Sequence, residues 1–91
     1  MVVDDKPYSE QVDGNTRLRV ISERVDKKEL VWHRDKKDRV VEVIQSDGWE
    51  FQMDNQLPIV LEKGKKIEIP KEVYHRVIKG DGDLIIKIIE T

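Results

Sequence analysis

Hydrophobic and polar side chains alternate along most of this chain with a period of two, and no long helical stripe interrupts the pattern. The alternation predicts about eight short strands, with turn residues roughly every 8–12 positions. These strands cover residues 17–24, 29–33, 39–45, 49–53, 59–62, 67–69, 73–78 and 84–90. Many short strands separated by regular turns are typical of an all-β sandwich or barrel.

Glycine-containing turns predict how these strands connect. Asp47-Gly48 favours a type I′ hairpin between its two flanking strands, because both central residues must accept positive φ. Residues 63–65 form another predicted turn, and residues 80–83 a further hairpin turn. The strand at 84–90 is apolar at nearly every position, which predicts that it is central or covered on both faces.

The two ends of the chain differ in pattern. Residues 1–15 carry no period and are interpreted as an N-terminal arm, either flexible or swapped onto an exposed strand edge of a partner. Residues 16–91 form a single predicted β-barrel domain. An arm of this kind favours a homodimer.

Composition narrows the class of protein. The 91 residues suffice for one domain, and 17 basic against 19 acidic side chains leave a formal charge of −2, which argues against a nucleic-acid surface. Cysteine is absent, so any metal must be held by histidine and carboxylate. Neither a signal-peptide pattern nor an apolar stretch long enough for a bilayer is present, so we expect a cytoplasmic protein without membrane contact.

The two histidines are the main candidates for chemistry. Strand alternation places Tyr74 and His75 on opposite faces, and it places Val31 and His33 on one face with Trp32 on the other. If both histidines face inward, the barrel interior holds two imidazoles.

The segment around His75 resembles the second motif of the cupin family, which consists of small RmlC-like antiparallel jelly-roll barrels. That motif has a glycine, a proline, a second glycine, a histidine and an asparagine at fixed offsets. Gly64, Pro70 and His75 occupy the matching positions. Glu72 replaces the second glycine, and Lys79 replaces the asparagine.

The family's first motif is only partly kept. His33 matches its second histidine, whereas Val31 stands where the first should be. Asp38 matches the glutamate in the longer-spaced form, and Val25 and Gln45 replace the two glycines. The resemblance runs from Val25 to the end of the chain, and it implies an antiparallel jelly-roll fold.

A divalent metal site follows as a hypothesis. His33, Asp38 and His75 could supply two histidines and one carboxylate, the set that binds Fe, Mn, Ni or Zn while leaving positions open. A one-residue change in strand register would turn Glu42 inward in place of Asp38. In the alternative hypothesis no metal binds, and the histidines only line a pocket.

The resemblance implies functions that range from dioxygenases and isomerases to non-enzymatic binding proteins. The main hypothesis is a small-molecule-binding protein, with or without a divalent metal, whose ligand pocket includes Val31, Trp49 and Phe51. The alternatives are a metal-dependent oxygenase or isomerase and a non-catalytic assembly dimer. Whether the protein is an enzyme stays open at this point.

Overall fold

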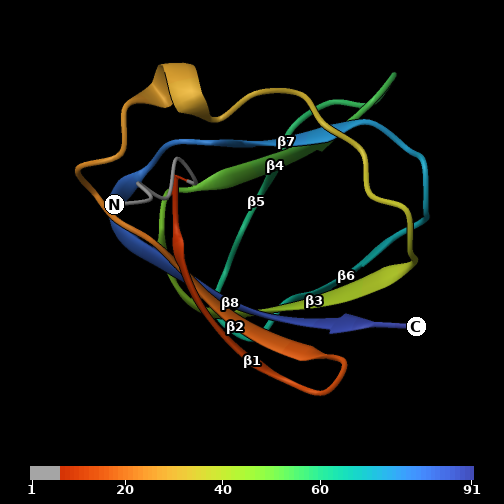
Figure 1. The fold of residues 1–91 in the computed structure, drawn as a ribbon. Helices are drawn as coiled ribbons and strands as arrows, with labels where there is room; N and C mark the ends of the chain where they lie inside the picture. Colours follow the sequence, from red (N-terminus) through yellow and green to blue (C-terminus); the bar gives the residue numbers. More distant parts are fainter. Residues whose placement is uncertain (1–6) are drawn as a thin grey trace, which may run out of the picture.

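Two antiparallel sheets face each other in the computed structural model, which describes residues 7–91 (Figure 1). The larger sheet has the order β1-β2-β8-β3-β6, with β1 (Ser9–Asp13), β2 (Thr16–Ile21), β3 (Arg39–Asp47), β6 (Lys66–Ile69) and β8 (Asp81–Glu90). The smaller sheet has the order β5-β4-β7, with β4 (Glu50–Met53), β5 (Ile59–Val60) and β7 (His75–Ile78). The predicted all-β jelly-roll architecture is confirmed.

The core lies between the sheets, because alternate residues of the strands point inward. In β8, Leu84, Ile86 and Ile88 are buried, while the residues between them are half-buried on the outer face. β8 pairs with β2 on one side and β3 on the other, which confirms the predicted central strand. Trp49 and Leu84 are fully buried.

The predicted hairpins at Asp47-Gly48 and at residues 80–83 are wrong. β3 and β4 join different sheets, and so do β7 and β8, so each turn carries the chain across the core instead of back along its neighbour. The two crossings pack against each other: a Cβ at Gly80 would overlap the backbone of Trp49 and Asp47. Turn residues mark where a strand ends, but long-range packing determines which sheet the next strand joins.

Residues 29–33 were expected to form a strand, and this expectation is also wrong. The 3₁₀ helix η1 (Lys27–Glu29) ends where that strand was expected to begin, and the Asp26 carboxylate caps this helix by accepting a hydrogen bond from the Lys28 backbone N–H at 3.0 Å. Only His33 is β-paired, through an isolated bridge to His75. Within residues 7–91, no helix is long and apolar enough to cross a membrane.

The N-terminal segment contains a strand that periodicity missed. β1 pairs with β2 of the same chain, in the register Glu10 opposite Arg19. Its inner side carries the carboxylate of Glu10, which pairs with Arg17 and Arg19, so no apolar alternation was visible. Residues 1–6 of the predicted arm lie outside the described residues.

Candidate metal centre

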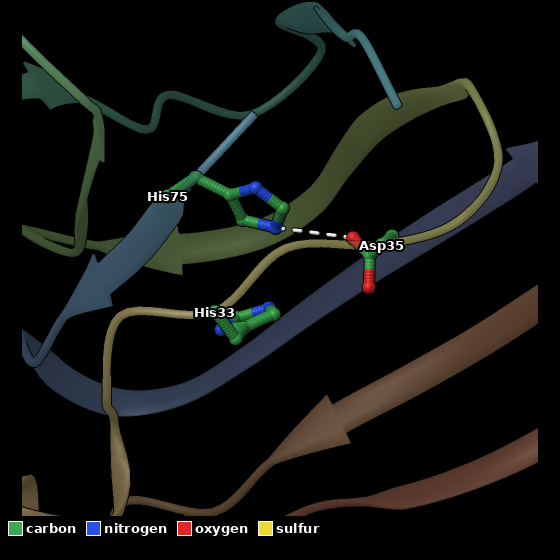
Figure 2. A group of neighbouring side chains, drawn as sticks. All are labelled: His33, Asp35 and His75. Carbon is green, nitrogen blue, oxygen red and sulfur yellow. Dashed lines mark ion pairs between the residues drawn. The ribbon is translucent and has the colours of Figure 1, made fainter. Parts of the chain in front are cut away.

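His33 and His75 lie side by side because their backbones are hydrogen-bonded to each other. The His33 N–H donates to the His75 carbonyl at 3.0 Å, and the His75 N–H donates to the His33 carbonyl at 2.8 Å. This bridge brings an irregular segment against the first residue of β7, as Figure 2 shows. The two ring centroids are consequently 4.4 Å apart in a T-shaped arrangement.

Asp35 completes the group. Its Oδ2 lies 3.2 Å from His75 Nε2 (Figure 2). The same oxygen lies 3.2 Å from Arg39 Nη1. The Asp35 backbone is held in place because its carbonyl accepts a hydrogen bond from the Glu72 N–H at 2.7 Å. One ligand atom from each of His33, Asp35 and His75 lies within 4.8 Å of the others.

Backbone carbonyls determine which nitrogen of each ring is available. His33 Nδ1 lies 2.9 Å from the Val31 carbonyl, and His75 Nδ1 lies 2.9 Å from the Val73 carbonyl. A carbonyl oxygen only accepts, so each Nδ1 carries the hydrogen, and in the neutral rings each Nε2 keeps its lone pair. Hydrogen bonds of this kind orient metal-binding histidines in proteins.

The buried contact between His75 and Asp35 tests whether these residues fit a cation. With Nδ1 protonated, a neutral His75 points the lone pair of Nε2 at Asp35 Oδ2, a buried oxygen that accepts no well-aligned hydrogen bond, although the Arg39 guanidinium lies 3.2 Å from it. Two lone pairs at this distance repel unless a positive charge lies between them. A divalent metal would supply that charge, as would a second proton on His75. The donor set of two imidazoles and one carboxylate fits Fe, Mn, Ni or Zn.

Electrostatics favour ligands in the deprotonated form. A hydrogen bond from the His75 ring, which requires a hydrogen on Nε2, holds the pKa of the Asp35 carboxyl below its usual range, and the Arg39 guanidinium adds to this effect. The pKa of His33 is also lowered, mainly because the cavity walls withhold water from its charged form. His33 is nevertheless exposed on one side, at the mouth of the cavity.

A cavity of about 480 Å³ opens beside these three side chains. Val31 and Phe51 are among its lining residues, together with mostly apolar residues of both sheets. Trp49, the third predicted pocket residue, is not part of the lining. It is fully buried in the core, where its Nε1 donates to the carbonyls of Asp81 and Gly82.

The carboxylates predicted from the sequence lie elsewhere. Asp38 Oδ1 accepts a hydrogen bond from the Lys71 N–H at 2.8 Å, on the exposed side of the turn. Glu42 lies opposite Lys66 and Lys87 in the strand register, between the inward-facing Val41 and Val43, so it faces outward. Asp35 was missed, although alternation from His33 alone would have placed it on the same face.

Comparisons with known proteins support the fold. No protein-family model and no curated protein sequence match the chain. Among solved structures, it is similar to an RmlC-like cupin protein with a double-stranded β-helix fold from Methanocaldococcus jannaschii, at a TM-score of 0.68 and 14% identity, covering 100% of this chain and 85% of that one. It is also similar to a cupin-2 domain protein from Shewanella frigidimarina, at a TM-score of 0.64 and 24% identity. That match covers 91% of this chain and 80% of the other.

A third similar structure is a DMSP lyase from Ruegeria pomeroyi, at a TM-score of 0.66 and 14% identity. The match covers 86% of this chain but only 39% of the lyase. Identities at this level establish the fold alone. The chain therefore has the fold of the small RmlC-like cupins, with two histidines and an aspartate gathered beside its cavity.

Proposed function

We propose that this protein binds a small molecule in the cavity between its sheets, next to a divalent metal ion held by His33, Asp35 and His75. The contact that carries the proposal is the one between His75 Nε2 and Asp35 Oδ2, a buried pair at 3.2 Å with no hydrogen between them in the neutral tautomer. Asp35 replaces Asp38 as the acidic ligand.

The surrounding residues support metal binding over a simple ion pair. A lowered pKa keeps His33 neutral, so its Nε2 lone pair is available at neutral pH. Phe51, whose ring centroid is 5.6 Å from that of His75, and the apolar cavity wall limit access of water. When bound, the metal would act as a Lewis acid towards an oxygen of the bound molecule.

Catalysis is a second candidate function. Three protein ligands leave coordination positions open for a substrate, and the cavity adjoins them. The DMSP lyase among the similar structures indicates that a domain of this shape occurs in a metabolic enzyme. An oxygenase or isomerase reaction would use the same residues. The homodimeric state and the cytoplasmic location stay predictions.

Metal binding can be tested directly by titrating Zn²⁺ into untagged, chelator-treated protein in a calorimeter. We expect one ion per chain. Asp35→Asn and His75→Ala should each weaken binding at least a hundredfold, because loss of an outer hydrogen-bond partner alone costs roughly 10–100-fold.

Asp38→Asn is the matched control, since it neutralises a carboxylate three positions from Asp35 that lies outside the group. It should bind Zn²⁺ like the unmodified protein. Binding that is absent, or that is weakened as much by Asp38→Asn as by Asp35→Asn, would refute the proposed centre.

A further inference from the structure

The charged residues of the cavity wall differ in how fully they are neutralised. Arg39 binds two carboxylates: its Nη1 lies 3.2 Å from Asp35 Oδ2, and its Nη2 lies 2.8 Å from Glu90 Oε2. Arg19 pairs with one carboxylate among residues 7–91, through Nε and Nη2, both 2.7 Å from the same oxygen of Glu10. Arg17 takes the other oxygen of Glu10 at 2.8 Å. Within the described residues, Arg19 therefore shares its counter-ion with Arg17.

Arg19 is nevertheless part of the cavity lining and is 9% exposed. Its guanidinium stacks on Tyr8, 3.8 Å from the ring centroid, and Tyr8 lines the same cavity. Arg19 and His33 line the same cavity. A buried arginine beside a cavity is suited to bind a second carboxylate through the N–H groups that its first counter-ion leaves free.

The sum of the charges in this network also favours an anionic ligand. Arg17, Arg19 and Arg39 are matched by the carboxylates of Glu10, Asp35 and Glu90, which makes the network neutral before any metal binds. A divalent ion at the candidate metal centre would leave two positive charges in excess. Glu29, the remaining carboxylate of the lining, is exposed at the mouth, where water screens it.

The rest of the wall is apolar. Both sheets contribute to it, with Ile21, Val41, Ile67, Ile86, Ile88 and Phe51 among the lining residues. The volume of about 480 Å³ falls in the usual range for small-molecule sites, roughly 300–1,000 Å³. A ligand that matches these walls has one anionic end and an apolar body.

We infer that the small molecule is a monocarboxylic acid, whose carboxylate pairs with Arg19 and whose apolar body packs between the sheets. This inference rests on the proposed function, since it names the ligand class of that cavity. It assigns Arg19 as the residue that selects an acid over an uncharged analogue.

The test compares acids with their isosteric amides: phenylacetate with phenylacetamide, and hexanoate with hexanamide. Affinities for the Zn²⁺-loaded protein are measured by NMR titration, with the Arg19 Nε–Hε signal followed. Each acid should bind at least about tenfold tighter than its amide, because a hydrogen bond to a charged group contributes about 1.5 kcal/mol or more. Equal affinities for acid and amide would overturn the inference.

Three variants separate Arg19 from the metal as the cause of the preference. Arg19→Met should abolish it. Arg17→Met should keep it, because Arg17 also pairs with Glu10 from β2 but does not line the cavity. Glu10→Gln should strengthen acid binding by freeing Arg19, an effect opposite in sign that misfolding would not produce. A preference that survives Arg19→Met refutes the assignment.

Zinc binding is measured first in the same samples, so the two proposals can fail separately. If zinc binds and acids are not preferred, only the acid inference fails. If zinc does not bind, the proposed metal centre fails, and the acid–amide comparison is made on the metal-free protein. Equal affinities there would refute the role of Arg19 as well.

Discussion

The two histidines of the candidate metal centre make the same local hydrogen bond but differ in burial and in the secondary structure that holds them. Each Nδ1 lies 2.9 Å from the carbonyl two residues before it. His75 begins β7, is 4% exposed and packs against Phe51. His33 lies in an irregular segment, is exposed, and is held mainly by its backbone bridge to His75.

This difference indicates that one half of the site belongs to the folded core and the other half is attached to it. His75 belongs to strand β7 and is buried in the core. The attached half supplies His33 and Asp35, and it is fixed by hydrogen bonds to His75 and Glu72 and by the ion pair with Arg39. Loss of a ligand from each half should therefore affect metal binding alike and stability differently.

The largest expected effect comes from replacing each histidine in turn. His75→Ala should lower the free energy of unfolding of the metal-free protein by about 2 kcal/mol, because it removes a buried side chain and leaves a cavity. His33→Ala should change it by less than about 0.5 kcal/mol, since an exposed ring is lost and the backbone bridge remains. Urea unfolding with a chelator present measures both.

Far-ultraviolet circular dichroism of the two variants serves as the control for an intact fold. Similar losses of stability for both histidines would contradict the comparison. A larger loss of stability for His33→Ala than for His75→Ala would show that the attached segment, and not β7, contributes more to the stability of the fold.

The same contrast explains how much of the site the sequence could predict. His75 follows Gly64 and Pro70 at motif offsets, and alternation separated it from Tyr74 on the opposite face; the structure buries His75 and leaves Tyr74 exposed. Asp38 was predicted to join the histidines in place of Asp35 because residues 29–38 were expected to form a strand followed by a solvated loop. Their path depends on the cap of η1 and on the Glu72–Asp35 hydrogen bond, neither of which has a periodic signal.

The fold shows a similar limit. Strand positions follow from alternation, because half-buried strands need it, and the apolar run at 84–90 located the central strand. Sheet membership does not follow, since a turn such as Asp47-Gly48 looks the same whether the chain folds back or crosses the core. Charged inward residues such as Glu10 hid β1 for a related reason: the pairing partners, not hydrophobicity, stabilise them.

A smaller effect on stability is expected from replacing Glu72, which lies in the turn before His75 and contacts the attached half of the site. This residue has φ of +64° where the cupin motif has glycine, and its N–H holds the Asp35 carbonyl. Glu72→Gly should raise the free energy of unfolding by about 0.5–1 kcal/mol, because left-handed backbone is strained for a side-chain-bearing residue. The strain relief exceeds the loss of the exposed Glu72–Arg34 ion pair, which is worth roughly 0–1 kcal/mol.

Glu68→Gly is the matched control, since Glu68 is also exposed but lies within β6. It should lower stability, because glycine weakens a strand. If Glu72→Gly also lowered stability in thermal unfolding, the ion pair or the glutamate stem would outweigh the backbone strain.

The smallest effect should be a change in how stability depends on pH. It involves Arg39, which pairs with Asp35 in the attached half and with Glu90 in β8. Hydrogen bonding to Arg39 holds the pKa of Glu90 below its ordinary value of about 4.3. Because the folded pKa is depressed, the stabilisation is complete above that ordinary value and is lost as the pH falls through the folded pKa. Glu90→Gln should therefore flatten the loss of stability below about pH 4.3, measured by urea unfolding between neutral pH and pH 3.

Glu62→Gln, an exposed change without an ion pair among residues 7–91, should leave the pH profile unchanged. Parallel profiles for the unmodified protein and Glu90→Gln would show that Glu90 does not anchor Arg39. Arg39 would then hold Asp35 without help from β8, and the attached half of the site would depend on its backbone hydrogen bonds to His75 and Glu72.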